Sequence, residues 1–226
     1  MVQPPTAKTS LSRLLRRILS AASLAWLATL LDLWYGLRRL AASLQEEGLY
    51  EFLVYDATLE LRDAKGRTAV FHKHQRVKFL QDQILVFEDY MWGDGDIFAR
   101  YRVAPGVVAD RYQESDRWTV LISLRETKQR GDVQDFHIER LVRNGFTKSE
   151  EWQQAEIRHR TRYLRLAVIF PKARPCRRAT IRLRRRRQTI PLGQEHFQQL
   201  PDGRQMVRWT TRNVTPLEVF TLRWQW

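Results

Sequence analysis

Residues 216–226 alternate between apolar and polar positions. One side of an extended chain would carry the large apolar residues of this segment, which are Phe220, Leu222, Trp224 and Trp226. The other side would carry Thr221, Arg223 and Gln225. Because successive side chains of a strand point to opposite faces, the pattern predicts one buried face and one wet face. Aromatic side chains of this size dominate burial, so we expect this strand to close a hydrophobic core.

The same period of two recurs from Tyr50 onward, in stretches separated by turn residues. The alternating stretches are 53–61, 97–103, 118–124 and 164–170, and the turns include 63–66, 93–96, 105–106 and 201–203. This spacing is typical of an antiparallel β-sandwich of Greek-key, immunoglobulin-like type with roughly ten strands. The fold class that we expect is therefore mainly β.

Some segments depart from simple alternation. Ile84–Trp92 is apolar on both faces, which predicts a central strand. Residues 147–150 match a helix capping box, although an extended approach to the next strand is the alternative. Polar residues interrupt two otherwise apolar strand faces, at Lys73 and Gln75 and again at Arg140.

The first 48 residues have a different, helical pattern. A long helix is expected from Ser10 or Ser12 to Glu47, with Gly48 as its terminator. Residues 18–33 are apolar nearly all round, so packing on protein, membrane contact and a linker or fusion helix are all open. The residues expected to dock this helix are Arg13, Arg16, Arg17, Trp26 and Trp34. We expect two parts, a helical segment 1–48 and a β-domain 49–226, with a polar loop at 126–132 as the place where the latter could divide.

The net charge of +14 is concentrated in two regions. Residues 171–212 hold twelve Lys and Arg against Glu195 and Asp202, and residues 1–48 carry a net charge of +3. Cys176 is the only cysteine, so an intramolecular disulfide is excluded and a reducing compartment is expected. The expected location is the cytoplasm, with peripheral membrane attachment or anchoring through residues 10–40 as a further option.

A run of arginines is the strongest local signal. On an extended strand Arg182, Arg184 and Arg186 would face one way, spaced about 7 Å apart. Such a ladder suits an acidic protein, an anionic surface or a phosphate backbone, and the expected contact residues are Arg178, Arg182, Arg184, Arg186 and Arg187. The alternative is an edge strand protected from aggregation by like charge.

Candidate metal ligands are weak. His72 and His74 would share one strand face, a spacing compatible with zinc, but no third ligand is evident in the sequence. Asp89, Asp94 and Asp96 could offer oxygen atoms to calcium, although Asp-Gly pairs are also simply good turns. We therefore expect no metal and no cofactor. Arginines beside Cys176 could lower its pKa.

Motifs for nucleophilic catalysis, phosphate binding or dinucleotide binding are absent from the sequence. The prediction is a non-enzymatic binding or adaptor module, in which a basic sheet face meets an anionic partner and the N-terminal helix anchors the protein. A nucleic-acid-associated subunit of a larger complex is the alternative, and nucleic acid is the less favoured partner because exposed aromatics do not accompany the charge.

Overall fold

The computed structural model describes residues 48–226. Its strands are β1 (Tyr50–Leu61), β2 (Thr68–Phe79), β3 (Ile84–Met91), β4 (Asp96–Ala104), β5 (Val107–Glu114), β6 (Arg117–Lys128), β7 (Val133–Arg143), β8 (Glu150–Ile157), β9 (Thr161–Phe170), β10 (Arg178–Leu183), β11 (Gln188–Pro191), β12 (Phe197–Gln199), β13 (Gln205–Val214) and β14 (Glu218–Gln225), with a 3-10 turn η1 (Gln194–His196) before β12. The predicted mainly-β fold is confirmed for this part of the chain. The helix expected before Gly48 lies outside the described residues, and so do Arg13, Arg16, Arg17, Trp26 and Trp34.

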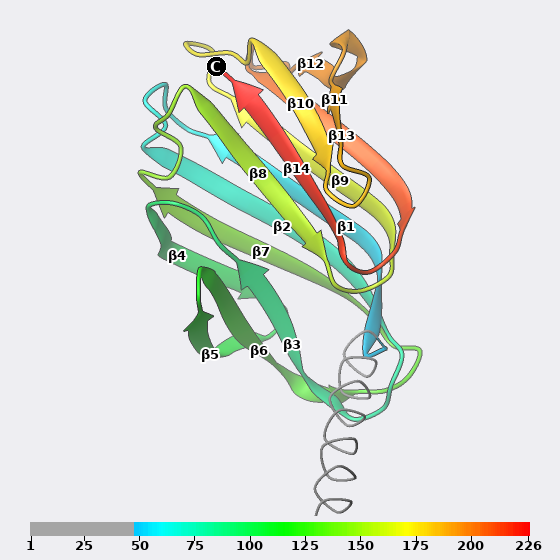
Figure 1. The fold of residues 1–226 in the computed structure, drawn as a ribbon. Coiled ribbons are helices and arrows are strands. Elements are labelled where there is room, and N and C mark those ends of the chain that lie inside the picture. The colour runs from blue at the N-terminus through cyan, green and yellow to red at the C-terminus, as the bar shows by residue number, and fades with distance from the viewer. Residues whose placement is uncertain (1–47) are drawn as a thin grey trace, which may run out of the picture. The chain divides into compact units, whose positions relative to one another are not determined.

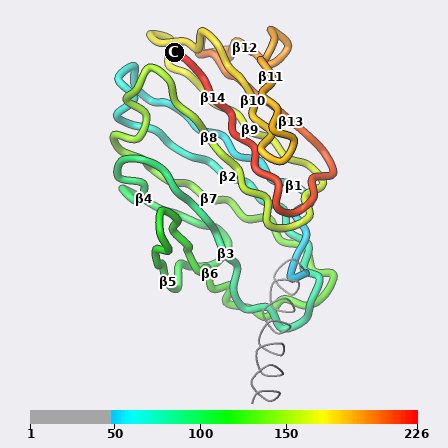
Figure 2. Tube along the Cα trace, viewed as in Figure 1, coloured from blue at the N-terminus to red at the C-terminus, as the bar shows by residue number. Residues whose placement is uncertain are grey.

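The strands form three sheets. A seven-stranded sheet has the order β12-β13-β9-β1-β2-β7-β4, a four-stranded sheet the order β11-β10-β14-β8, and a three-stranded sheet the order β3-β6-β5. The two smaller sheets lie in front of the large one (Figure 1). Figure 2 follows the chain through β3, β5 and β6 as a group separate from β8, β10 and β14.

Both smaller sheets pack on the same face of the large sheet. Phe87 of β3 stacks on Phe136 of β7, with ring centroids 4.2 Å apart. Trp224 of β14 meets Phe170 of β9 at 5.9 Å, and its side chain is 1% exposed. Burial of large aromatic side chains from both layers is the main source of stability in such a core. The predicted inward face of the last strand is confirmed.

The antiparallel prediction is wrong for one central pair. β1 runs parallel to β9, from Phe52 opposite Thr161 to Glu60 opposite Ile169. Alternation of side chains is the same in parallel and antiparallel strands, so the pattern carries no information on direction. The strand number of about ten was also too low, because short strands such as β11 and β12 have too few residues to show a period.

Two local predictions are resolved by the tertiary arrangement. The prediction that Ile84–Trp92 is central is wrong: β3 is the end strand of its sheet, and Leu85 is 57% exposed. The capping-box residues 147–150 lead directly into β8 without a helix, so the extended alternative holds. The turn at 63–66 has the expected left-handed glycine, since Gly66 has a φ of 67°.

No helix within residues 48–226 has both the length and the apolar character that crossing a bilayer requires. The apolar stretch 18–33 lies outside the described residues.

Candidate functional site

Two cations lie on the inner face of the seven-stranded sheet, where the neighbouring positions are apolar. Arg140 of β7 is the cross-strand partner of Phe71 of β2, and Lys73 is the partner of Ile138. Lys73 is 6% exposed and Arg140 is 8% exposed. The regular alternation of β2 and β7 therefore carries both charged groups into the interior. Burial of a charge is costly unless the group is paired, so their partners define the site.

Lys73 is neutralised by a carboxylate from the opposite layer. Asp89 points inward from β3 and accepts a hydrogen bond from Nζ of Lys73. Tyr101 of β4 donates from its hydroxyl to the second oxygen of Asp89, at 3.0 Å. Burial acts to lower the pKa of Lys73, but the charge of Asp89 and the proximity of Tyr55 outweigh it, so this pKa is raised. Burial, followed by the charge of Asp89, raises the pKa of Tyr101. Both tyrosine and lysine therefore remain protonated near neutral pH.

Among residues 48–226, Arg140 forms no ion pair of its own with a carboxylate, although the charge of Asp89 acts to raise its pKa. Its guanidinium lies 4.9 Å from the centre of the Phe71 ring, a cation–π contact. Burial lowers the pKa of Arg140, yet arginine stays charged at neutral pH. Within the described part of the chain, its buried Nη1 has no hydrogen-bond partner. The Oε1 atom of Gln153, on β8, is likewise buried without a partner there.

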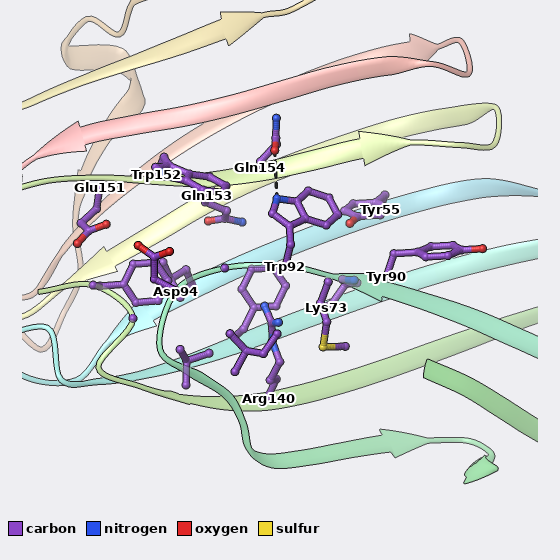
Figure 3. Close-up of a pocket in the computed structure, with 18 residues that line it drawn as sticks. Tyr55, Lys73, Tyr90, Trp92, Asp94, Arg140, Glu151, Trp152, Gln153 and Gln154 are labelled. Carbon is purple, nitrogen blue, oxygen red and sulfur yellow. Dashed lines mark hydrogen bonds between the residues drawn. The ribbon is translucent and has the colours of Figure 1, made fainter. Parts of the chain in front are cut away.

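These groups line a pocket between the layers, with a cavity of about 60 Å³. Lys73 and Arg140 form its inner end, while Phe71, Trp92 and Phe146 supply aromatic surface. The Trp92 indole donates to Oε1 of Gln154 at 3.1 Å and so spans the front of the pocket (Figure 3). One water-sized group needs roughly 10–15 Å³ on this measure, so the cavity can hold a small polar group.

The far end of the pocket is acidic. Asp94 and Glu151 are drawn facing the same space in Figure 3. Asp94 is paired with Nζ of Lys148 at 2.7 Å, and one oxygen of Glu151 accepts from the Lys148 backbone N–H at 2.7 Å. Burial raises the pKa of Glu151. The pocket therefore has a cationic inner end, and its carboxylates lie at the other end.

The predicted arginine ladder is only partly formed. β10 ends at Leu183, and Arg187 N–H donates to the Arg184 carbonyl at 3.1 Å, which closes a turn. The expectation that the strand continues through this run is wrong, because a tight turn lets the chain return as β11. The five predicted contact residues, Arg178, Arg182, Arg184, Arg186 and Arg187, are all exposed. A shallow groove brings Arg182 and Arg184 together with Arg223 and Trp152.

The histidines lie on the outer face of the large sheet. His74 and His72 share that face as expected, and His74 stacks on His137 of β7 with ring centroids 4.7 Å apart. Nε2 of His74 lies 2.7 Å from a carboxylate oxygen of Asp135. Parallel stacked rings do not direct their nitrogen atoms at a common point. No group of three or more metal-ligating side chains occurs in residues 48–226.

The aspartates considered for calcium do not converge. Asp89 pairs with Lys73, Asp94 pairs with Lys148, and Asp96 accepts from the Phe98 backbone N–H at 3.1 Å. The suggestion that arginines lower the pKa of Cys176 is wrong. Cys176 is buried, and burial raises its pKa to about 11.

Sequence reasoning named Asp94 as a candidate metal ligand, but it did not single out Lys73 and Arg140 as parts of a site. A signal was present, because Lys73 and Arg140 each interrupt an apolar strand face. The sequence shows each interruption on its own strand, but it does not show that the two strands are neighbours. The meaning of the interruptions depends on strand register, which places Arg140 beside Phe71 and Lys73 one step along the same face.

Comparison with known proteins adds a likeness in fold. Similar solved structures include the M1 zinc metallopeptidase from Deinococcus radiodurans, with 10% identity and a TM-score of 0.46. A mutant of that enzyme bound to a Tyr-Ser-Ala substrate has 10% identity and a TM-score of 0.47. Each match covers 76% of this chain and 42% of the other, so the chain spans less than half the length of those structures. No family model and no curated protein matches the sequence.

This comparison does not support the prediction of a non-enzymatic adaptor, and the nucleic-acid-associated alternative stays a prediction. The two similar structures named above are those of a metallopeptidase. The prediction depended on two basic regions and on the absence of catalytic motifs, and the turn after Leu183 breaks the extended ladder of one of those regions. At 10% identity we carry no activity and no residue role from those enzymes to this chain.

Proposed function

We propose that the β-domain binds a small molecule through a carboxylate group in the pocket beside Arg140. The observation that carries this proposal is the buried Nη1 of Arg140, which has no hydrogen-bond partner among the described residues. A buried donor on a charged group is costly to leave unpaired, by roughly 1–3 kcal/mol or more. A ligand oxygen at this position would recover that free energy.

The charges of the inner pocket favour an anion. Asp89 is hydrogen-bonded to Lys73 and Tyr101, and its charge also acts on Arg140. One carboxylate beside two buried cations leaves one net positive charge. The planar guanidinium group matches a carboxylate through two parallel N–H···O bonds, which makes a carboxylate a better partner than a neutral acceptor.

The walls favour a ligand whose carboxylate is attached to an apolar or aromatic body. Phe71, Phe146 and Trp92 line the pocket along the way to its mouth. A cavity of about 60 Å³ accepts the head of the ligand, and its body extends between the aromatic side chains. Pockets of this kind combine apolar surface with a few polar groups that set orientation.

Calorimetric titration with phenylacetate and with phenylacetamide tests the proposal, because the two probes differ in charge at similar shape. Phenylacetate should bind at least tenfold more tightly. Arg140→Gln should remove that preference, whereas Arg143→Gln, at an exposed position of the same strand, should leave it unchanged. Equal binding of the two probes, or an unchanged preference in Arg140→Gln, would overturn the proposal. Should Arg140→Gln fail to fold, Arg140→Lys is the second variant. It retains the charge but loses the two parallel N–H donors, so a weaker preference for phenylacetate over phenylacetamide is expected.

A further inference from the structure

The front layer of the domain is divided between two strand edges. The four-stranded sheet ends at β8 and the three-stranded sheet ends at β3. We call the space between them the β3–β8 seam. Within the described residues, β8 pairs only with β14 and β3 only with β6, so no ladder of backbone hydrogen bonds crosses the seam. The two edges face each other across the pocket that Lys73 and Arg140 line (Figure 3).

The two strands run in opposite directions along the seam. Trp92, just after β3, bonds to Gln154 in the middle of β8. Arg158, just after β8, lies over the ring of Tyr90 at 3.9 Å. Residue numbers therefore decrease along β3 in the direction in which they increase along β8. Figure 1 shows the same opposed directions.

The free edge of β8 has identifiable backbone groups. The carbonyls of Ser149 and Ile157 accept hydrogen bonds from Trp226 and Leu217, which places odd-numbered residues toward β14. Successive residues of a strand direct their N–H and C=O to opposite edges. The backbone groups of Trp152, Gln154 and Glu156 therefore point into the seam.

Side chains, not backbones, close the seam. The Trp92–Gln154 hydrogen bond crosses it at 3.1 Å, and Arg117 pairs with Glu156 at 2.5 Å. Two cavities of about 60 Å³ and 30 Å³ lie along it, and Lys73, Tyr90 and Trp92 line both. A strand inserted between two others needs about 10 Å between its neighbours, and here side chains rather than backbone groups bridge the space between β3 and β8.

We propose that the ligand of this site is an extended acidic peptide, which inserts as a strand between β8 and β3. This inference rests on the proposed function, because one inward side chain of the peptide, Asp or Glu, supplies the carboxylate for Arg140. Charge complementarity selects this occupant, since two buried cations, Lys73 and Arg140, share the single carboxylate of Asp89, and Nη1 of Arg140 has no hydrogen-bond partner among the described residues. Backbone hydrogen bonds to the free edges supply the affinity, and the alternate side chains supply specificity.

Insertion requires both side-chain bridges across the seam, Trp92–Gln154 and Arg117–Glu156, to open. The Trp92 indole would leave Gln154 and move aside, and the peptide backbone would take its place. A single strand inserted here would join the two front sheets through β8 and β3.

The test compares the pentapeptide acetyl-Val-Thr-Glu-Thr-Val-amide with acetyl-glutamic acid amide, which carries the same side chain without neighbouring strand residues. The peptide should bind at least tenfold more tightly. Methylation of the backbone nitrogens of the peptide should reduce its affinity to that of acetyl-glutamic acid amide. Replacement of Glu by Gln in the unmethylated peptide should also weaken binding, because the carboxylate for Arg140 is lost. Amide hydrogen exchange should slow at Trp152, Gln154 and Glu156 when the peptide binds.

The outcomes separate the two proposals. Equal affinity of the peptide and the single amino acid, with no protection of the β8 amides, would overturn strand insertion and leave carboxylate binding intact. Failure of both probes and of phenylacetate would overturn carboxylate binding itself. The N-methylated peptides test the backbone hydrogen bonds without altering the protein, and their affinity should fall to that of acetyl-glutamic acid amide.

Discussion

Arg140 and Phe71 are cross-strand partners, and the guanidinium of Arg140 lies 4.9 Å from the centre of the Phe71 ring. The ring stabilises the buried cation through its quadrupole, by about 2 kcal/mol when the pair is desolvated. A ring face does not satisfy the directional N–H groups of the guanidinium. This pairing therefore holds Arg140 in place and leaves Nη1 for a ligand.

Asp89→Asn should strongly destabilise the domain. The substitution leaves Lys73 charged in the interior without its carboxylate. Breaking a buried ion pair by removal of one partner costs about 3–5 kcal/mol, and urea unfolding at neutral pH measures it. In a Lys73→Met background the same change should cost less, because Lys73 is no longer there to lose its carboxylate and only Arg140 loses the nearby charge of Asp89. A loss below about 1 kcal/mol in the single variant would contradict the assignment of this pair.

Gly66→Ala and Gly131→Ala form a matched pair of backbone tests. Both glycines have positive φ, 67° and 96°, where an alanine is strained by roughly 1–2 kcal/mol. A Cβ at Gly66 would lie 1.7 Å from the Phe146 carbonyl oxygen, whereas at Gly131 nothing lies within 4 Å. Thermal unfolding should show a several-fold larger loss for Gly66→Ala. Equal losses would mean that the contact with Phe146 is not retained.

Stability should depend on pH through Glu51. Hydrogen bonds from Arg162, at 3.0 and 2.9 Å, hold the pKa of Glu51 below its ordinary value of 4.5. A carboxyl whose pKa is lowered by folding contributes stability above its unfolded pKa and loses it as pH falls through the folded pKa. Arg162→Gln should therefore lower the melting temperature at pH 7, and the difference from the parent should shrink well below pH 4.5.

The control for this test is Glu51→Gln, which removes the titrating group. In that background, Arg162→Gln should have an effect that no longer varies with pH over the acidic range. A pH-dependent difference that survives Glu51→Gln would assign the effect to another carboxyl.

Local pattern was sufficient to locate much of the β structure. Phe220, Leu222, Trp224 and Trp226 all point inward, and the left-handed turn at Gly66 is where the Asp-Ala-Lys-Gly sequence placed it. These features depend on the period of two and on the steric freedom of glycine, which act over a few residues. The same locality explains the error at β3, since an apolar segment reads alike at the centre and at the edge of a sheet.

The sequence by itself determined that residues from Tyr50 onward are strands with one apolar face, and that Lys73 and Arg140 are exceptions on such faces. Only the tertiary structure decided which strands are neighbours, that β1 and β9 are parallel, and that Asp89 comes from another layer to neutralise Lys73. Contacts between residues far apart in the chain depend on register and direction, and side-chain alternation specifies neither of them. The tertiary structure alone also decided the pocket, the lack of a partner for Nη1 of Arg140 among the described residues, and the facing edges of β3 and β8.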